Sequence, residues 1–360
     1  DAYPAAGDSR DDPRNVILQE YRGQALAESG TSMAVAHVSG EAAILLSRGV
    51  GTEGAIRAIR AGVRDVGAPG PDNASGGGAV DLPAALQAAA SGAAPRDAVG
   101  YWLVASDGGL FAFGEAPFLG STGDIRLNAP IVGMAATPSG RGYWMVASDG
   151  GIFGFGDAGF YGSAAGERLG SPVVAMAPTP SGRGYWLVTA RGAVRAYGDA
   201  VWWGDASGVA LKAPVVGMAP VRQRDEAGRD GYWLVAGDGG IFSFGSAAFY
   251  GSTGSMRLNA PVVGLTPTPS SSGYWLLAGD GGIFAFGDAP FFGSTGNLRL
   301  NRPVVGMTPT CYGQGYWLVA SDGGIFAFGA APFLGSTGDM PLNRPVVGML
   351  VAADHRAAQY

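Results

Sequence analysis

The sequence predicts a multidomain protein in which a partial α/β segment is followed by an all-β, six-bladed β-propeller. Three observations support this fold class. Gly accounts for 63 of the 360 residues, more than twice the usual share of roughly 7%. A Tyr-Trp pair recurs every 42 residues, with one interval of 47. The first 95 residues lack this repeat and show helical periods and Ala-rich runs instead.

The composition excludes several classes of protein. Apolar residues make up 47% and charged residues 14% of the chain, which excludes a disordered protein. No apolar run approaches the roughly 18 residues of a membrane-spanning helix. The net charge of −6 and the absence of a basic stripe argue against nucleic-acid binding. Cys311 is the single cysteine, so no internal disulfide is expected, and no cofactor or resident metal is predicted.

The repeat is defined by its Tyr-Trp pair, and each unit contains four short apolar runs separated by Gly, Asp, Pro and Ser. Short runs with such turn residues between them indicate β-strands. Four strands in about 42 residues is typical of one propeller blade. The repeats begin at Tyr101, Tyr143, Tyr185, Tyr232, Tyr274 and Tyr316.

The second repeat illustrates the four expected strands. Residues 143–146 form the first, which is apolar on both faces and therefore covered on both. The Asp-Gly of residues 148–151 predicts a primed hairpin turn into a second strand at 152–155. A third strand is expected around Phe160 and Tyr161. The fourth, at 173–176, follows a proline, which suits the first position of a strand.

The phase of the repeat indicates how the propeller closes. The last Val-Val-Gly-Met run, at residues 346–349, has no Tyr-Trp strand after it, whereas the first Tyr-Trp strand has no such run before it. If this run is the innermost strand, the last copy completes the first blade and closes a ring. An open solenoid is the alternative.

The third repeat departs from the others. Arg191 replaces the turn aspartate, Arg195 and Tyr197 replace two phenylalanines, and Trp202 and Trp203 stand outside the pattern as candidate surface contacts. A metal site on the turn aspartates would be broken here, so turn chemistry is the better interpretation of these residues. The aspartates are Asp107, Asp149, Asp238, Asp280 and Asp322.

The six tryptophans of the Tyr-Trp pairs allow two interpretations. Aromatic platforms stack on sugars, but large aromatics at identical positions are favoured as the core between blades. The unit resembles, almost letter for letter, a GYWLVASDGGIFAFG repeat of secreted and cell-surface actinobacterial proteins. That resemblance covers about 250 residues. It implies an extracellular or envelope-associated setting and no defined ligand.

Residues 29–40, SGTSMAVAHVSG, are similar to the serine signature of subtilisin-like proteases. The resemblance covers the final third of that domain, roughly residues 10–92. It implies that Ser32 is the nucleophile and that its backbone N–H forms half of the oxyanion hole. A helix is expected to continue to Leu46. A second, capped by Thr52, would turn Ile56, Ile59 and Val63 to one face. The resemblance also implies a closing strand at 78–81 and a last helix starting at Pro83.

The partners that a serine nucleophile needs are missing from these residues. By resemblance, His37 is a structural histidine, and the catalytic Asp and His precede the serine by a long stretch of chain. His355 lies in the tail, and no histidine precedes Ser32. The oxyanion-hole asparagine would also lie upstream, so Asn15 does not qualify. Asp1, Asp8, Asp11 and Asp12 form a polar loop, and Ala36 replaces the usual proline.

Two functions follow as expectations. The first is a secreted subtilisin-like serine endopeptidase acting by acyl transfer, present here as a C-terminal part that is inactive alone. Its propeller would bind a protein or peptide substrate, a cell-envelope component or a glycan. The alternative is a non-catalytic extracellular binding or structural module carrying a protease relic. The expected boundaries are 1–92 for the protease part, 93–99 for a linker, 100–350 for the propeller and 351–360 for a tail.

Overall fold

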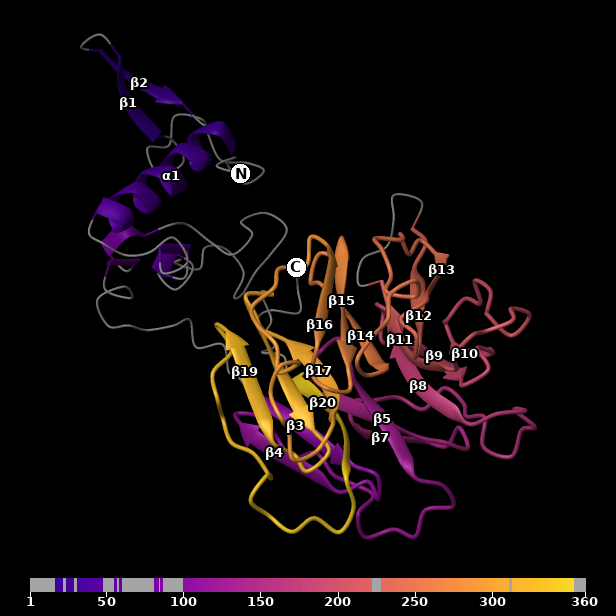
Figure 1. Cartoon of the computed structure of the whole chain (residues 1–360). Helices are drawn as coiled ribbons and strands as arrows, with labels where there is room; N and C mark the ends of the chain where they lie inside the picture. The colour runs from indigo at the N-terminus through magenta and orange to yellow at the C-terminus, as the bar shows by residue number, and fades with distance from the viewer. Residues whose placement is uncertain are drawn as a thin grey trace. The chain divides into compact units, whose positions relative to one another are not determined.

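A computed structural model describes residues 17–21, 24–28, 31–47, 55–56, 58–59, 81–83, 85–86, 100–221, 228–310 and 313–352. The chain divides near residue 97 into two compact units, which are described separately (Figure 1). The predicted linker at 93–99 and the residues from 353 onward lie outside the described residues.

The first unit contains an antiparallel hairpin followed by a helix. Strands β1 (Ile17–Tyr21) and β2 (Gln24–Glu28) pair, and α1 runs over Thr31–Ser47, which confirms a helix from the serine signature to beyond Leu46. A small core contains Leu45, Ala55, Ala58, Ile59 and Ala85.

One expectation about this core is wrong. Ile56 is 40% exposed, whereas Ile59 is buried together with Ala55 and Ala58. The small alanines therefore form the packed face beside Ile59. Thr52, Val63 and residues 78–80 lie outside the described residues, so the predicted cap and most of the closing strand stay predictions. Leu82, Pro83, Ala85 and Leu86 are helical, as expected near Pro83.

The second unit consists of six three-stranded antiparallel sheets, consistent with a six-bladed β-propeller. We number the sheets by their central Tyr-Trp strand. The inner, central and outer strands are β20 (Val346–Ala352), β3 (Gly100–Ala105) and β4 (Leu110–Gly114) in sheet 1; β5 (Ile131–Ala136), β6 (Gly142–Ala147) and β7 (Ile152–Gly156) in sheet 2; β8 (Val173–Pro178), β9 (Gly184–Thr189) and β10 (Val194–Gly198) in sheet 3; β11 (Val215–Pro220), β12 (Gly231–Ala236) and β13 (Ile241–Gly245) in sheet 4; β14 (Val262–Pro267), β15 (Gly273–Ala278) and β16 (Ile283–Gly287) in sheet 5; and β17 (Val304–Pro309), β18 (Gly315–Ala320) and β19 (Ile325–Gly329) in sheet 6.

The ring is closed by the last strand, as the phase of the repeat predicts. β20 pairs with β3, with Val351 opposite Tyr101. The six inner strands neighbour one another in a cycle, because β20 lies beside both β17 and β5. This pairing excludes the open solenoid. β20 ends at Ala352, two residues beyond the expected boundary.

Each sheet has three strands, so the expected third strand around Phe160 and Tyr161 is wrong. The segment after the outer strand is irregular. Its backbone groups pair with isolated backbone groups and with side chains instead of a strand ladder. In sheet 2, Trp144 Nε1 donates to the Gly159 carbonyl at 2.7 Å, and Tyr185 Oη donates to the Gly162 carbonyl.

The hairpin turn also differs from the expected primed type. Gly150 N donates to Ala147 O at 2.9 Å, and Ala147 N donates to Gly151 O at 2.8 Å. Gly150 has φ +85°, whereas Asp149 has an ordinary negative φ. This is a three-residue loop with a type I turn and a left-handed glycine, so the aspartate needs no strained backbone. The same pattern recurs at Gly108, Gly192, Gly239, Gly281 and Gly323.

The tryptophans of the Tyr-Trp pairs form the core between sheets, as favoured from the sequence. All six are fully buried, as are their tyrosines. Each tryptophan contacts the tyrosine of the next sheet, and Trp317 contacts Tyr101 at 5.6 Å between ring centroids, which closes the cycle. The other pairs are Trp102–Tyr143, Trp144–Tyr185, Trp186–Tyr232, Trp233–Tyr274 and Trp275–Tyr316. These rings are unavailable for stacking on a sugar.

Candidate functional sites

Ser32, the predicted nucleophile, is the second residue of α1. A helix is favoured here because the residues that follow Ser32 are mostly apolar helix formers. The first turn of a helix carries free backbone N–H groups and a partial positive charge, which favour a developing oxyanion. The described backbone therefore places Ser32 in the first turn of a helix. The side chain of Ser32 lies outside what the structure describes.

The other residues considered with Ser32 are not brought to it by the described structure. His37 also lies in α1, and its side chain is outside the description. Ala36 is likewise in α1. Asn15, the four N-terminal aspartates and His355 lie outside the described residues. Among the described residues, no group of three or more His, Cys, Asp or Glu side chains could hold a metal ion.

The turn aspartates act locally, which supports the turn interpretation. Asp107 Oδ1 accepts a hydrogen bond from Gly109 N at 3.0 Å, two residues along. Asp149, Asp238, Asp280 and Asp322 make the same bond to the second glycine of their turns. Each carboxylate thus stabilises its own turn.

The most exposed aromatic side chains of the second unit form a repeated set. Trp202 stands 17 positions after Tyr185, and a phenylalanine stands at the same position of every other repeat. The interpretation of Trp202 as outside the pattern is therefore wrong, although its surface exposure is confirmed at 58%. We call these residues the aromatic belt: Phe118, Phe160, Trp202, Phe249, Phe291 and Phe333, which are 58–66% exposed.

Trp203 has a different role from its neighbour. It occupies the partly buried position next to the aromatic belt, where the other repeats have Leu, Tyr or Phe. Its indole Nε1 donates to Asp230 Oδ1 at 2.8 Å, and its backbone N donates to Tyr232 Oη. Trp203 therefore secures sheet 3 to sheet 4, and of the two tryptophans only Trp202 is exposed.

A second exposed set lies seven positions after the aromatic belt. We call it the aliphatic set: Ile125, Val209, Met256, Leu298 and Met340, which are 49–58% exposed. The second repeat has Glu167 here instead. Glu167 Oε2 lies 3.2 Å from Arg195 Nε of sheet 3. Arg195 itself replaces a phenylalanine, so one ion pair replaces two apolar side chains at the boundary between sheets 2 and 3.

Tyr197 completes this polar boundary. Its Oη donates to Glu167 Oε1 at 3.1 Å. Burial, followed by the hydrogen bond and the negative charge of Glu167, raises the pKa of Tyr197 to about 12. The phenol is therefore protonated over the physiological range and serves as a donor. Arg195 and Tyr197, which diverge in the third repeat, therefore both contact Glu167, which diverges in the second repeat.

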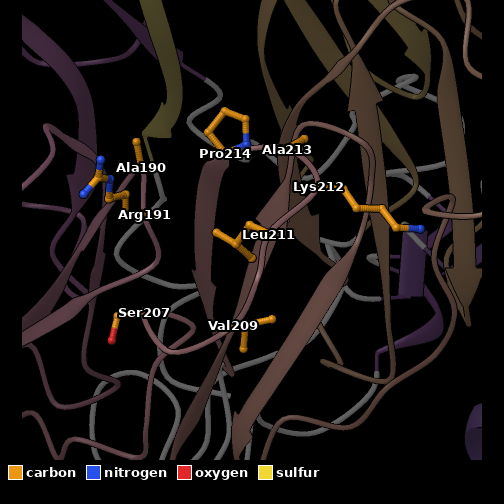
Figure 2. A pocket seen from close by; sticks show the side chains of 8 residues that line it. All are labelled: Ala190, Arg191, Ser207, Val209, Leu211, Lys212, Ala213 and Pro214. Carbon is orange, nitrogen blue, oxygen red and sulfur yellow. The ribbon is translucent and has the colours of Figure 1, made fainter.

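Two shallow pockets lie at equivalent positions on sheets 3 and 4. The first encloses about 340 Å³ and the second about 230 Å³, each between a hairpin turn and the loop before the next inner strand. Figure 2 shows Arg191 and Lys212 on opposite sides of Leu211, with their charged ends directed away from each other. The two cations do not converge on one anion. Residues of the aliphatic set, Val209 and Met256, line these pockets.

No protein-family model matches the chain, and no curated protein matches it significantly. No helix among the described residues is long and apolar enough to cross a membrane.

The sequence contained the signal for the aromatic belt, but it was missed. The triplets around it read PFL, GFY, VWW, AFY, PFF and PFL in the six repeats. Comparing Trp202 with the Tyr-Trp tryptophans concealed its alignment with the phenylalanines. Aligning each repeat from its tyrosine recovers the position directly.

Proposed function

We propose that the chain joins a ring-shaped binding module to part of a secreted, subtilisin-like serine endopeptidase. The observation that carries the proposal is Ser32 in the first turn of α1, within Gly-Thr-Ser-Met-Ala and directly after the β1–β2 hairpin. Ser32 would attack a peptide carbonyl and transfer the acyl group to water. The ring would hold the enzyme to a protein substrate or to the cell envelope, in an extracellular setting.

The chemistry needs more than the serine. A serine hydroxyl requires a histidine base that a carboxylate orients. The 31 residues before Ser32 contain no histidine, so the proposal requires a base and a carboxylate from other residues. We expect the 360 residues alone to show no peptide hydrolysis.

Active-site labelling tests this function. The full-length natural gene product is incubated with a biotinylated fluorophosphonate, beside its Ser32→Ala and Ser39→Ala variants. Ser39 is an exposed serine of the same helix and provides the matched control. We expect labelling that Ser32→Ala abolishes and Ser39→Ala retains. Folded full-length protein that takes no label would refute the endopeptidase proposal.

The second candidate is a non-catalytic extracellular binding or structural module. It is favoured by the completeness of the ring, in which all six sheets are present and each repeat supplies an exposed aromatic residue. Unlabelled full-length protein that still binds a ligand through the ring would support this alternative.

A further inference from the structure

We propose that the aromatic belt binds a neutral polysaccharide by stacking its rings on separate sugar units of one polymer. This rests on the part of the proposed function that makes the ring a binding module, and it names the ligand class. It does not depend on Ser32.

The first argument is the constancy of an exposed position. Single exposed apolar residues need no explanation, but six aromatic residues at one repeated position do. The third repeat has changed its turn and its outer strand, yet Trp202 keeps the aromatic character. The aliphatic set is nearly as exposed and has not kept its character, because Glu167 replaces it in one repeat. Packing therefore tolerates a change at the aliphatic position, whereas the belt position retains a planar ring.

The second argument is the position of the rings on their loops. In sheet 1, Trp102 Nε1 donates to Pro117 O at 2.8 Å, and Leu119 N donates to Tyr143 Oη at 3.2 Å. Phe118 lies between these two anchored residues and is 62% exposed. The backbone on both sides is fixed, so little conformational entropy is lost when a ligand stacks on the ring.

The third argument is charge. The segments from 14 to 20 positions after each repeat tyrosine contain no Lys or Arg. They contain five acidic residues: Glu115, Asp157, Asp199, Asp205 and Asp288. Four of these stand three residues before a belt ring. This excess of acidic residues disfavours an anionic polymer or an anionic lipid surface, although Arg141 pairs with Asp157 at 3.8 Å. Asp157, Asp199 and Asp288 each accept hydrogen bonds from a threonine and a serine of the loop before their central strand. Their contribution is therefore negative charge, which a neutral sugar does not oppose.

The fourth argument is distribution. The rings occur one per sheet, so a ligand that engages several of them must extend across neighbouring sheets. One exposed ring binds weakly. A polymer that engages several rings gains affinity through effective concentration, which a single small ligand cannot do. The C–H face of a sugar ring matches the negative face of an aromatic ring, whatever its position along the polymer.

The test is native affinity electrophoresis of the full chain in gels that contain hydroxyethylcellulose, laminarin or dextran. Polygalacturonate serves as an anionic comparison. The belt variant carries Phe118→Ala, Phe160→Ala, Trp202→Ala, Phe249→Ala, Phe291→Ala and Phe333→Ala. The matched control carries alanine at all five residues of the aliphatic set, which are similarly exposed. Near-ultraviolet circular dichroism establishes that each variant is folded.

We expect at least one neutral polysaccharide to retard the chain, with little effect of 1 M NaCl. The belt variant should lose about tenfold or more in apparent affinity, whereas the control stays within about twofold. If the sixfold variant does not fold, the three-site variant Phe118→Ala, Trp202→Ala and Phe291→Ala replaces it and should show an intermediate loss. Single substitutions should each lose less than about threefold.

Several outcomes overturn the inference. These are no retardation by any of the three neutral polysaccharides, retardation by polygalacturonate alone, or equal losses in the belt variant and the control. Belt-dependent sedimentation with phosphatidylcholine vesicles would assign the rings to lipid. Belt-dependent self-association in sedimentation velocity would assign them to a second copy. None of these results affects fluorophosphonate labelling, so failure of this inference is distinguishable from failure of the endopeptidase proposal.

Discussion

Sheet 3 and sheet 5 show which parts of the repeat the ring requires. Sheet 5 has the common turn aspartate, Asp280, whereas sheet 3 has Arg191. Both nevertheless keep a buried tryptophan whose indole donates to a carbonyl 15 residues along, Val201 O for Trp186 and Pro290 O for Trp275. Turn and edge side chains can therefore change as a matched set, as Glu167 and Arg195 do, while the aromatic core between sheets is retained.

The largest effect that we expect from this shared core is a loss of folding stability of the six-sheet unit at alkaline pH. Burial raises the pKa of all six repeat tyrosines above the usual value of 10.0, and that of Tyr232 to about 12. The folded state therefore holds these protons more tightly than the unfolded state. Their contribution to stability is complete below pH 10 and is lost as the pH rises from about 10 toward 12.

Urea unfolding at several pH values measures this loss, and ultraviolet difference spectroscopy follows tyrosine ionisation. Tyr232 lies at the boundary between sheets 3 and 4. It should ionise at a higher pH than an ordinary tyrosine, because burial and the charges of Asp205 and Asp230 oppose its ionisation. Unfolding midpoints that stay constant up to pH 12 would contradict the prediction.

A smaller effect should separate sheets 3 and 5 through the glycine that follows the outer strand of each. A Cβ on Gly293 of sheet 5 would lie 2.5 Å from Phe328 Cδ1, whereas a Cβ on Gly204 of sheet 3 would lie 3.0 Å from Phe244 Cδ1. Both glycines have positive φ, +134° and +121°. We expect Gly293→Ala to cost about 2–4 kcal/mol through strain and overpacking, and Gly204→Ala about 1–3 kcal/mol. Chemical denaturation of both variants gives the order, and a larger loss for Gly204→Ala would show that the packing of sheet 4 is misjudged.

The smallest effect concerns the ion pair at the boundary of sheets 2 and 3. The side chains of Glu167 and Arg195 are 43% and 40% exposed, so water weakens their attraction. A double-mutant cycle with Glu167→Met and Arg195→Phe should give a coupling free energy of about 0.2–1 kcal/mol that 1 M NaCl reduces. Strict additivity of the two substitutions would show that they do not act as a pair.

The sequence predicted the central and inner strands well, because their signals are local. The fully apolar Tyr-Trp strand needs cover on both faces, and the run after Pro172 suits a strand start. Closure of the ring followed from counting the Tyr-Trp runs and the Val-Val-Gly-Met-type runs along the chain. These predictions depend on residue type and period alone.

The expected third strand failed because the deciding contacts lie elsewhere in the chain. The Gly159 and Gly162 carbonyls accept from Trp144 and Tyr185, and only the folded ring brings those donors close. The turn type depends on whether Asp149 and Gly150 both take positive φ or Gly150 alone does. The Asp-Gly dipeptide is compatible with both turn types, so the sequence did not distinguish them. For Ser32 the sequence motif still carries more information than the structure, since its side chain is not described.

The pairing of β20 with β3 also determines when sheet 1 can be completed during protein synthesis. Sheet 1 needs Val346–Ala352, which follow Gly114, the end of β4, by 232 residues (346 minus 114). At roughly 5–20 residues per second, the ribosome delivers that strand some 10 to 50 s after the β3–β4 hairpin has formed. During this interval the inner edge of β3 is an unpaired strand edge, which another chain can occupy. The nascent ring is most vulnerable to mispairing at its first blade, and release of the last strand ends that period.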